Sequence, residues 1–426
     1  MARFTNKLMN SRKIIIGFIL LVSAIQIANA QTSSTTGALN GGNTLNAITT
    51  AVPVLLISPD SRAGAMGECG VATSPDINSM HWNAAKYAFI DKKVGVAASY
   101  TPWLRKLVPD ISLAYLAGYG KLDKNSAIAG SLRYFSLGTI NFTDATGNPN
   151  GNYKPNEFAL DLAYTRKLGE KFSAAMAFRY INSNLTGGLP LQNGTATKAG
   201  QAVAVDVSGF YSNKDIKVSG NKSELTFGFN ISNIGNKLSY TDNAAPEARN
   251  FLPMNLRLGS GLKLNLDDAN TVAFTVDLNK LLVPTPPRYK YDAAGSIVLD
   301  GNGERVIEAG KDPYRSVASG MFGSFNDAPD GFKEEMREII MQVGAEYWYD
   351  KLLALRAGYF HENKSKGGRQ FFTLGLGVKY NVFGLDFAYL VPTVPRNNPL
   401  QNTLRFSLSF DFDAFNKQNK ETTSDN

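Results

Sequence analysis

The stretch VAFTVDLNK, residues 272–280, alternates apolar and polar side chains along its length. In an extended chain, successive side chains point to opposite sides, so Phe274 and Val276 share one face while Thr275 and Asp277 share the other. A strand with one apolar and one polar face lies between an oily and a wet environment. The stretch therefore predicts a β-strand that separates two such environments.

The same alternation recurs elsewhere in the chain, in stretches of about ten residues, the length with which a tilted strand crosses a bilayer. Three clear examples are EFALDLAYT (157–165), FFTLGLGVKY (371–380) and TLRFSLSFDF (403–412). Between residues 93 and 412 we count about fourteen candidate strands, and bacterial outer-membrane barrels have even strand numbers. A soluble β-sandwich also alternates, so this period alone leaves both folds open.

The connections between the candidate strands favour the barrel. Tight links alternate with long ones: the tight ones are KLDKN, KLGEK, NLDDAN, YDK and NVFG, with NKDIKVSGNK somewhat longer. Short periplasmic turns and long outer loops are typical of a closed transmembrane barrel. We therefore predict an all-β, antiparallel transmembrane barrel of about 14 strands. It spans residues 93–412, has long extracellular loops, notably 284–332, and ends in a periplasmic polar tail, 413–426.

The N-terminal residues predict export. Basic residues without an acid precede the apolar run IIIGFILLVSAI, and ANA then resembles a cleavage site, which together indicate a signal peptide over residues 1–30. A flexible polar lead, 31–50, follows. The single cysteine, Cys69, excludes an internal disulfide and is expected to pack as a small apolar residue.

The net charge excludes one class of partner. The whole chain has a formal charge of +8, and 40 basic against 36 acidic residues remain once the leader is removed. This mild excess is spread along the chain, whereas a nucleic-acid-binding protein concentrates its basic residues in a patch or stripe. We expect no nucleic-acid partner.

The segment SRAGAMGECGVATSPDINSMHWNAAKYAF, residues 61–89, contains three glycines spaced three residues apart, Gly64, Gly67 and Gly70. A dinucleotide-binding loop would need a preceding strand and a following crossover helix, and the lysine of a Walker loop is absent. Ser74, Pro75 and Asp76 instead predict the start of a short helix. We interpret residues 51–92 as a plug-like segment that folds into the lumen, as in other wide barrels.

These residues carry a resemblance. The stretch from residue 50 to residue 89 closely resembles the N-terminal signature of the PorV family, an outer-membrane component of the type IX secretion system of the Bacteroidetes, itself similar to the FadL family of fourteen-stranded barrels. The matching positions are Pro59, Asp60, Arg62, Gly64, Met66, Gly67, Gly70, Asp76, Trp82 and Asn83. The chain departs from the family at Ala84, where proline is usual, and at Glu68 and Cys69, where Asp-Ala is usual.

The resemblance implies a function and partners. The protein would bind the C-terminal domain of secreted cargo leaving the translocon barrel of the system. It would then deliver this cargo to a surface complex that contains a PorU-like peptidase. Outer-membrane lipids would surround it. The alternative is a FadL-like channel for hydrophobic small molecules, whose plug moves to open a path.

The longest loop contains the candidate partner-binding residues. Aromatic and other large apolar side chains on an exposed loop often mark a contact surface, although they can also fold the loop onto the barrel mouth. The candidates are Tyr289, Tyr314, Met321, Phe322 and Phe325. Near the end of this loop, DGFKEEMREIIMQ (330–342) predicts a helix with an apolar stripe at Met336, Ile339 and Ile340 that leads into a strand.

Catalytic and metal-binding chemistry has little support. The two histidines, His81 and His361, are far apart, and no serine occupies a G-x-S-x-G motif. LDGNGE lacks most ligands of a calcium loop and is more simply the turn of a hairpin. We predict no enzyme activity, no cofactor and no metal. Some charged residues on the polar strand faces could line a permeation path or, more simply, pair inside a filled barrel: Asp161, Asp206, Asp277, Arg356, Lys379, Arg405 and Asp411.

Overall fold

A computed structural model of the chain describes residues 45–412, apart from 105–107, 109, 144–147, 190–194, 243, 395–399 and 402. The predicted signal peptide, the first part of the polar lead and the C-terminal tail 413–426 lie outside the described residues. In the part that is described, no helix is long and apolar enough to span a membrane.

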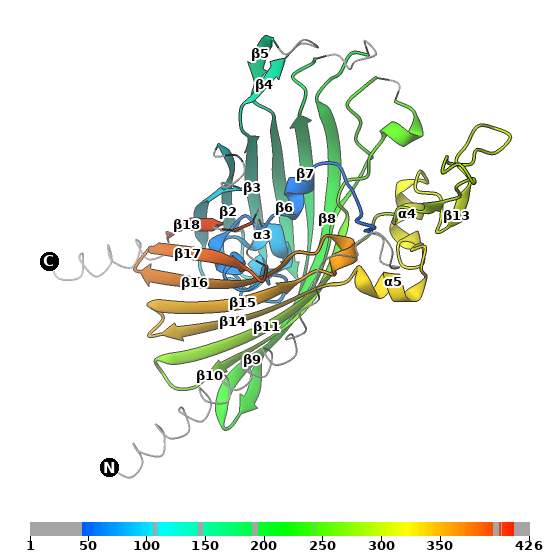
Figure 1. Ribbon diagram of the computed structural model, residues 1–426. Coiled ribbons are helices and arrows are strands. Elements are labelled where there is room, and N and C mark those ends of the chain that lie inside the picture. The colour runs from blue at the N-terminus through cyan, green and yellow to red at the C-terminus, as the bar shows by residue number, and fades with distance from the viewer. Residues whose placement is uncertain are drawn as a thin grey trace. The chain divides into compact units, whose positions relative to one another are not determined.

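Within the described residues, fourteen antiparallel strands form a closed barrel, which confirms the predicted fold (Figure 1). Each strand pairs with its neighbours along the chain, and the first pairs with the last to close the sheet. The strands are β1 (Val94–Pro102), β2 (Ile111–Lys121), β3 (Ser126–Leu137), β6 (Asn156–Lys167), β7 (Phe172–Asn184), β8 (Gly200–Val218), β9 (Asn221–Gly235), β10 (Asn255–Asn265), β11 (Asn270–Leu281), β14 (Ile340–Tyr349), β15 (Leu353–His361), β16 (Gln370–Tyr380), β17 (Phe383–Pro392) and β18 (Leu404–Asp411).

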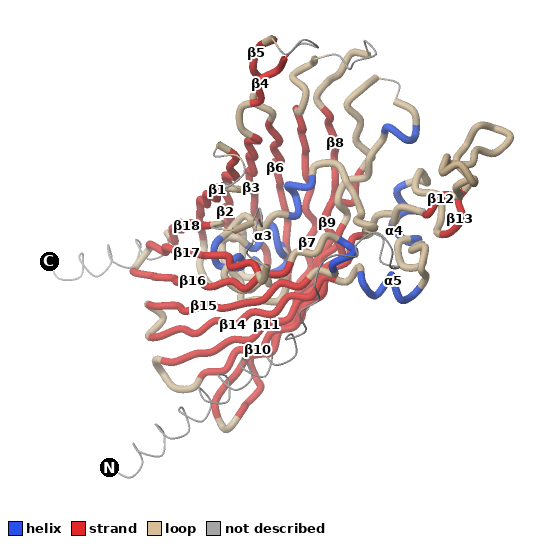
Figure 2. Tube along the Cα trace, viewed as in Figure 1, coloured by secondary structure: helices blue, strands red, loops and turns tan. Residues whose placement is uncertain are grey.

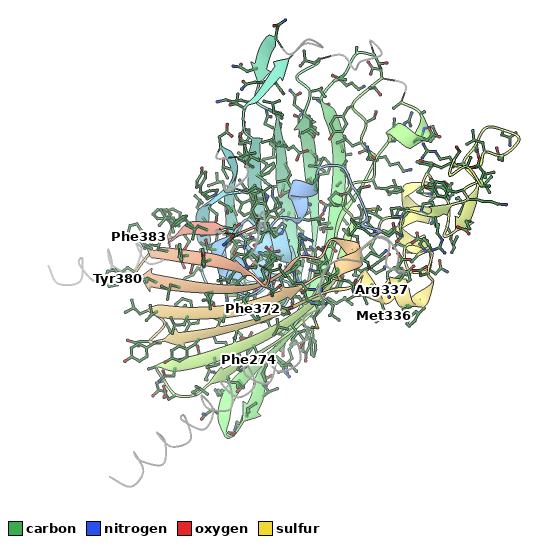
Figure 3. The ribbon with its side chains drawn as sticks, in the orientation of Figure 1. Phe274, Met336, Arg337, Phe372, Tyr380 and Phe383 are labelled. Carbon is green, nitrogen blue, oxygen red and sulfur yellow. The ribbon has the colours of Figure 1, made fainter. Side chains whose placement is uncertain are left out.

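The two faces of the wall have opposite chemistry. On β6, Leu160 and Leu162 are exposed on the outer side, whereas Asp161 and Thr165 are buried inside. The other strands follow the same rule, and Figure 3 labels three of the outward aromatic side chains of the wall, Phe274, Phe372 and Phe383. An apolar exterior and a polar interior are the arrangement of a barrel in lipid.

The strand connections are sorted by length between the two ends of the barrel. Short turns occupy residues 122–125, 168–171, 219–220, 266–269, 350–352 and 381–382, and longer segments make the alternate connections. The link NKDIKVSGNK is shorter than the sequence indicated, because β8 and β9 extend through it to a turn at Ser219 and Gly220. Both turn residues have positive φ, as a tight hairpin turn requires.

The N-terminal segment lies inside the barrel, where Figure 2 shows its short helices surrounded by strands. It contains η1 (Pro53–Leu56), α2 (Ser61–Gly64), α3 (Ser79–Trp82) and η2 (Ala84–Phe89). Helix α2 contacts β16, β17 and β18, whereas η2 contacts β3, β6, β7 and β8 on the other side of the lumen. We call residues 51–92 the plug.

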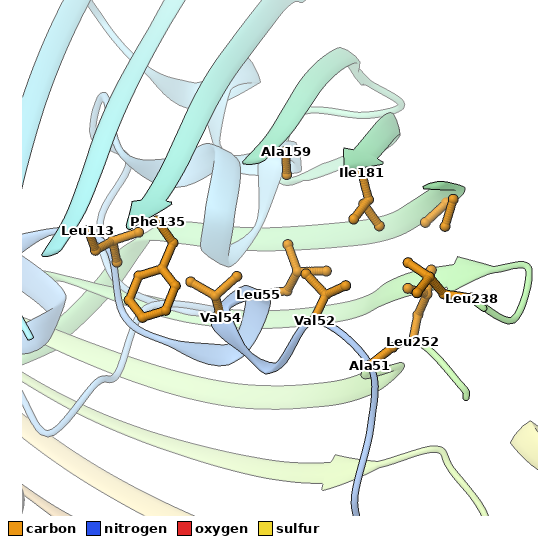
Figure 4. Close-up of a cluster of buried hydrophobic side chains, with 12 residues drawn as sticks. Ala51, Val52, Val54, Leu55, Leu113, Phe135, Ala159, Ile181, Leu238 and Leu252 are labelled. Carbon is orange, nitrogen blue, oxygen red and sulfur yellow. The ribbon is translucent and has the colours of Figure 1, made fainter. Parts of the chain in front are cut away.

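A hydrophobic cluster fixes the start of the plug against the wall (Figure 4). Val52, Val54 and Leu55 of the plug pack with Phe135 of β3 and Ile181 of β7. This cluster lies near the long-loop ends of these strands. A second hydrophobic cluster, which includes Tyr87 of η2 and Phe210 of β8, lies nearer the short turns. Together the two clusters pack the start and the end of the plug against the wall.

The remaining elements belong to the long connections. They are the hairpin of β4 (Ile140–Thr143) and β5 (Pro149–Tyr153), η3 (Pro246–Ala248), the pair β12 (Arg288–Tyr289) and β13 (Ile307–Ala309), α4 (Val317–Gly323), α5 (Phe332–Arg337) and η4 (Lys364–Lys366). The sequence LDGNGE forms a turn, in which the Asp300 carboxylate accepts hydrogen bonds from the backbone N–H groups of Asn302 and Glu304. This confirms the hairpin interpretation of that stretch.

Candidate functional site: the plugged lumen and the outer loop

The glycines of the plug allow its backbone to approach its neighbours closely. Gly67 has a φ of 65°, and a Cβ there would lie 2.6 Å from the Tyr359 carbonyl oxygen on β15. A Cβ at Gly70 would overlap the indole ring of Trp82. Both positions require glycine for packing, and neither builds a phosphate-binding loop.

The wall has glycines of its own where the plug backbone touches it. A Cβ at Gly358 would overlap the backbone nitrogen of Gly67, and one at Gly344 would lie 2.6 Å from the Met66 carbonyl oxygen. Gly228 faces the Val71 carbonyl in the same way. Plug and wall therefore meet backbone to backbone, and side chains of ordinary size at these positions would keep them apart.

A chain of buried charges joins the plug to the wall. Arg62 of the plug pairs with Asp76 of the plug at 2.7 Å and with Glu346 of β14 at 2.8 Å. Glu346 also pairs with Arg356 of β15 at 2.7 Å, and Arg356 pairs with Asp386 of β17 at 2.6 Å. A buried charge is tolerated when it is paired, and here each charge has an opposite partner.

Two acidic side chains connect the glycine-rich turn to opposite walls. Asp277 of β11 accepts hydrogen bonds from the backbone N–H groups of Gly70, at 2.7 Å, and Val71, at 3.0 Å. Glu68 of the plug pairs with Arg405 of β18 at 2.7 Å. Glu68, one of the three residues that depart from the family pattern, thus forms an ion pair with the wall.

Signature residues also organise the plug internally. Asp60 accepts hydrogen bonds from the Trp82 indole N–H, at 2.7 Å, and from the backbone of Ala63, at 2.9 Å, where it caps α2. The Asn83 amide donates to the carbonyls of Val71 and of Gly209 on β8, both at 3.0 Å. The structure brings all ten signature positions into this packed segment, where eight are buried and Arg62 and Asp76 are partly buried.

Most of the predicted lumen charges have partners inside the barrel. Arg179 of β7 binds Asp161 at 2.5 Å and Asp206 at 3.1 Å, which joins β6, β7 and β8. Asp277, Arg356 and Arg405 have the partners described above. Asp411 is buried, and Lys379, on the same face of β16 as the lumen residues, is exposed at the strand end.

Several important lumen residues were missed by the sequence analysis. Arg133 of β3 donates to the Val54 carbonyl at 2.7 Å and lies 2.7 Å from Nδ1 of His81, and Arg257 of β10 donates to the His81 carbonyl. Glu346 belongs to the same group of missed residues. Each occupies a polar-face position of a predicted strand, so the alternation itself contained the signal.

The histidines are accounted for by packing. His81 is buried and packs edge-on against Trp82, with ring centroids 4.5 Å apart. His361 lies at the end of β15 beside Tyr359. Cys69 is buried within the plug, as expected. Among the residues that the structure describes, no group of three potential ligands could hold a metal ion.

The five candidate partner-binding residues differ in exposure. Phe322 of α4 is 72% exposed and Phe325 just after it is 50% exposed. Met321, by contrast, packs against the cluster of Phe251, Met254, Leu282 and Val283. The guanidinium carbon of Arg305 lies over the Tyr289 ring, 5.6 Å from the ring centroid. Tyr314 is only moderately exposed. Of the five candidates, Phe322 and Phe325 are therefore the most exposed, whereas Met321 and Tyr289 help to fold the loop.

Helix α5 confirms one part of its prediction and corrects another. It forms within residues 330–342 and leads into β14, as expected. The expected apolar stripe is wrong, because Met336 is exposed while Glu334, Glu335 and Glu338 are buried. These acids bind Lys280 of β11 and Lys366 of η4. Both lysines lie outside residues 330–342, so the pattern of that stretch could not indicate them.

One hollow lies among the loops and another beside the plug. A cleft of about 520 Å³ lies between the β7–β8 and β9–β10 connections, with Lys198, Lys237 and Arg249 among its lining residues. The other hollow, beside Arg62, Thr226 and Glu346, has a volume of only about 20 Å³. The hollow beside the plug is thus about the size of one water molecule.

A closed antiparallel barrel with an apolar exterior and a packed plug is the architecture of an outer-membrane protein. Residues 40–288 match the family described as "Type IX secretion system protein PorV". The chain belongs to this family. No curated protein matches the chain.

Solved structures with a similar architecture are distant in sequence. A TodX deltaS2S3 mutant, a monoaromatic hydrocarbon channel, is 14% identical with a TM-score of 0.45, over 83% of this chain and 99% of that one. The toluene transporter TbuX of Ralstonia pickettii is 11% identical with a TM-score of 0.43, over 84% and 98%. A FadL homologue of Pseudomonas aeruginosa is 10% identical with a TM-score of 0.40, over 86% and 99%.

Proposed function

We propose that the protein binds the C-terminal domain of secreted cargo as the cargo leaves the translocon barrel, and delivers it to the cell-surface attachment complex with its PorU-like peptidase. In this proposal the long loops are extracellular and the chain termini are periplasmic. Membership of the PorV family supports a role in type IX secretion. The finer assignment rests on the outer loop between β11 and β14.

The observation that carries the proposal is the way this loop holds two exposed aromatic rings. Arg315 pairs with Asp327 at 2.8 Å across the base of α4, and Lys237 donates to the Tyr314 carbonyl at 3.0 Å. These contacts, with the packing of Met321, keep α4 in place. Phe322 and Phe325 are thus displayed on an ordered support, and exposed aromatic anchors of this kind dominate binding energy at protein interfaces.

The test replaces both rings by serine in the full chain. Because truncation of an anchor residue costs about 2 kcal/mol or more, we expect Phe322→Ser/Phe325→Ser to weaken cargo binding by at least roughly 30-fold. The measurement is the amount of cargo that co-purifies from outer membranes in mild detergent. The matched control is Tyr291→Ser/Leu299→Ser, which removes two exposed apolar side chains from the β12–β13 arm of the same loop.

Unchanged cargo recovery in the Phe322→Ser/Phe325→Ser variant, with a folded barrel, would contradict the proposal. A channel for hydrophobic small molecules is the competing function. This function requires the plug to move, which would break the ion pairs of Arg62 and Glu68 with the wall. Loss of hydrophobic solute uptake in a deletion strain, with secretion intact, would favour this alternative.

A further inference from the structure

Helix α5 has an unusual distribution of charge. Its two glutamates and Glu338, the residue that follows it, are all buried. Glu334 binds Lys366 at 2.5 Å, and Glu335 binds Lys280 at 2.9 Å. Glu338 bridges both lysines, at 2.6 Å to Lys280 and 2.9 Å to Lys366. The acids of this helix are therefore neutralised inside the protein and contribute little negative charge to its surface.

The opposite face of α5 is apolar and basic. Phe332 is 78% exposed and Met336 is 52% exposed. Lys333 is also exposed and Arg337 is half-buried. Neither basic residue forms an ion pair within the described part of the chain. A helical surface that combines large apolar side chains with unpaired basic ones is typical of segments that lie in a lipid interface.

The position of α5 makes this face continuous with the outer surface of the barrel. The helix ends at Arg337, and β14 begins at Ile340. The first outward residue of β14, Met341, lies opposite Leu278 of β11, and both are exposed apolar side chains. Figure 3 shows Met336 and Arg337 where the wall of strands meets the outer loop. The apolar band of the wall thus extends onto the helix.

We propose that this outward face of α5, formed by Phe332, Lys333, Met336 and Arg337, binds the lipid leaflet around the long-loop end of the barrel. Phe332 and Met336 enter the boundary between headgroups and acyl chains, and Lys333 and Arg337 bind the phosphates of anionic headgroups. The basic residues complement anionic lipid, and the apolar ones continue the lipid-facing wall. This inference does not depend on the proposed function.

The arrangement has a structural consequence for the loop. A helix held from inside by Lys280 and Lys366 and from outside by lipid fixes the C-terminal end of the segment that carries Phe322 and Phe325. The membrane would then act as a second support for the loop. A protein partner is a weaker explanation of this exposed face than lipid is. The apolar strand positions next to α5 already belong to the lipid-facing surface of the barrel.

The test measures lipid contact at Met336 in the full chain. Met336→Cys is made in a Cys69→Ala background, labelled with a fluorophore, and reconstituted in vesicles that contain nitroxide-labelled lipid. The wall position Phe372→Cys is the positive control, and the hairpin position Leu299→Cys is the control for a loop residue in water. The vesicles contain phosphatidylcholine alone or phosphatidylcholine mixed with phosphatidylglycerol.

We expect quenching at position 336 to approach that at position 372 and to exceed that at position 299 several-fold. Phosphatidylglycerol should increase quenching at position 336, and Lys333→Gln/Arg337→Gln should abolish this increase while the barrel stays folded. Quenching at 336 no stronger than at 299 would overturn the proposal, as would an insensitivity to phosphatidylglycerol. A cross-link from position 336 to another protein, without lipid quenching, would assign the face to a protein partner.

Discussion

The plug and the outer loop between β11 and β14 are built on opposite principles. The plug meets the wall through backbone contacts at glycines and through ion pairs such as that of Arg62 with Glu346, and nearly all of it is buried. The outer loop buries the acids of α5 against Lys280 and Lys366 and leaves aromatic residues such as Phe322 exposed.

This difference between the plug and the outer loop shows that buried ion pairs serve different purposes in the lumen and at the rim of the barrel. Inside the barrel, buried polar wall residues pair with the plug, as Asp277 does, or with one another, as Arg179 does with Asp161. At the rim, the acids of α5 pair with Lys280 and Lys366, and large apolar side chains are exposed. The plug therefore uses its polar groups to bind the wall, whereas the loop exposes apolar side chains. Three predictions test this comparison.

The largest effect is expected from Glu346→Gln. Glu346 accepts hydrogen bonds from both Arg62 and Arg356, so its neutral replacement leaves two guanidinium groups with less compensation. Removal of one partner of a buried ion pair costs about 3–5 kcal/mol. We expect the free energy of unfolding in detergent to fall by about this amount, and the plug to become sensitive to protease.

The matched control is Asp330→Asn, which removes an exposed carboxylate paired with Arg288 at 3.1 Å in the outer loop. Exposed ion pairs contribute about 0–1 kcal/mol, so this variant should behave nearly as the parent. Equal stability of the Glu346 and Asp330 variants would show that the lumen network contributes no more than a surface pair. The contrast between the plug and the loop would then be wrong.

A smaller but still clear effect is expected from Gly358→Val. A side chain there would overlap the backbone of Gly67, so the plug or strand β15 must shift, and overpacking of this kind costs about 1–3 kcal/mol. Gly120→Val is the control, because a Cβ at Gly120 in β2 meets nothing within 4 Å. Urea unfolding of both variants measures the difference, and equal midpoints would show that the plug is not held against β15.

The barrel was predictable because its signal is local and repeated. Alternation in residues 157–165 and 272–280 depends only on which side of the sheet a residue faces, and both stretches have the predicted faces. The presence of a plug was indicated by the resemblance of residues 50–89, whereas the helix start expected at Ser74–Asp76 was wrong, because α3 begins at Ser79. These features follow from neighbouring residues in the sequence.

The partners within the lumen were not predictable, because each pair joins positions far apart in the chain. Arg62 and Glu346 are 284 residues apart, and nothing local to either identifies the other. The same reason explains the error at α5. The helical period does not determine which face of α5 is buried. That face is determined by ion pairs with Lys280 and Lys366, which lie outside the helix.

The smallest effect is expected from acidification of the outer loop. Burial raises the pKa of Glu334, but the hydrogen bonds from Lys366, the backbone of Asp330 and Asn46 outweigh it and bring this pKa below its ordinary value. A carboxyl group with a lowered native pKa stabilises the folded state at pH values above the ordinary pKa. This contribution is lost as the pH falls through the native pKa.

We therefore expect a label at Met336→Cys, in a Cys69→Ala background, to become more mobile as the pH falls below about 4.3, the ordinary pKa of glutamate. Glu334→Gln should raise the mobility already at neutral pH and reduce this pH-dependent step, because glutamine resembles the protonated acid. A label at Phe372→Cys, on the wall, should not change. If the Glu334→Gln variant kept the full step, Glu334 would not be the group whose protonation loosens the helix.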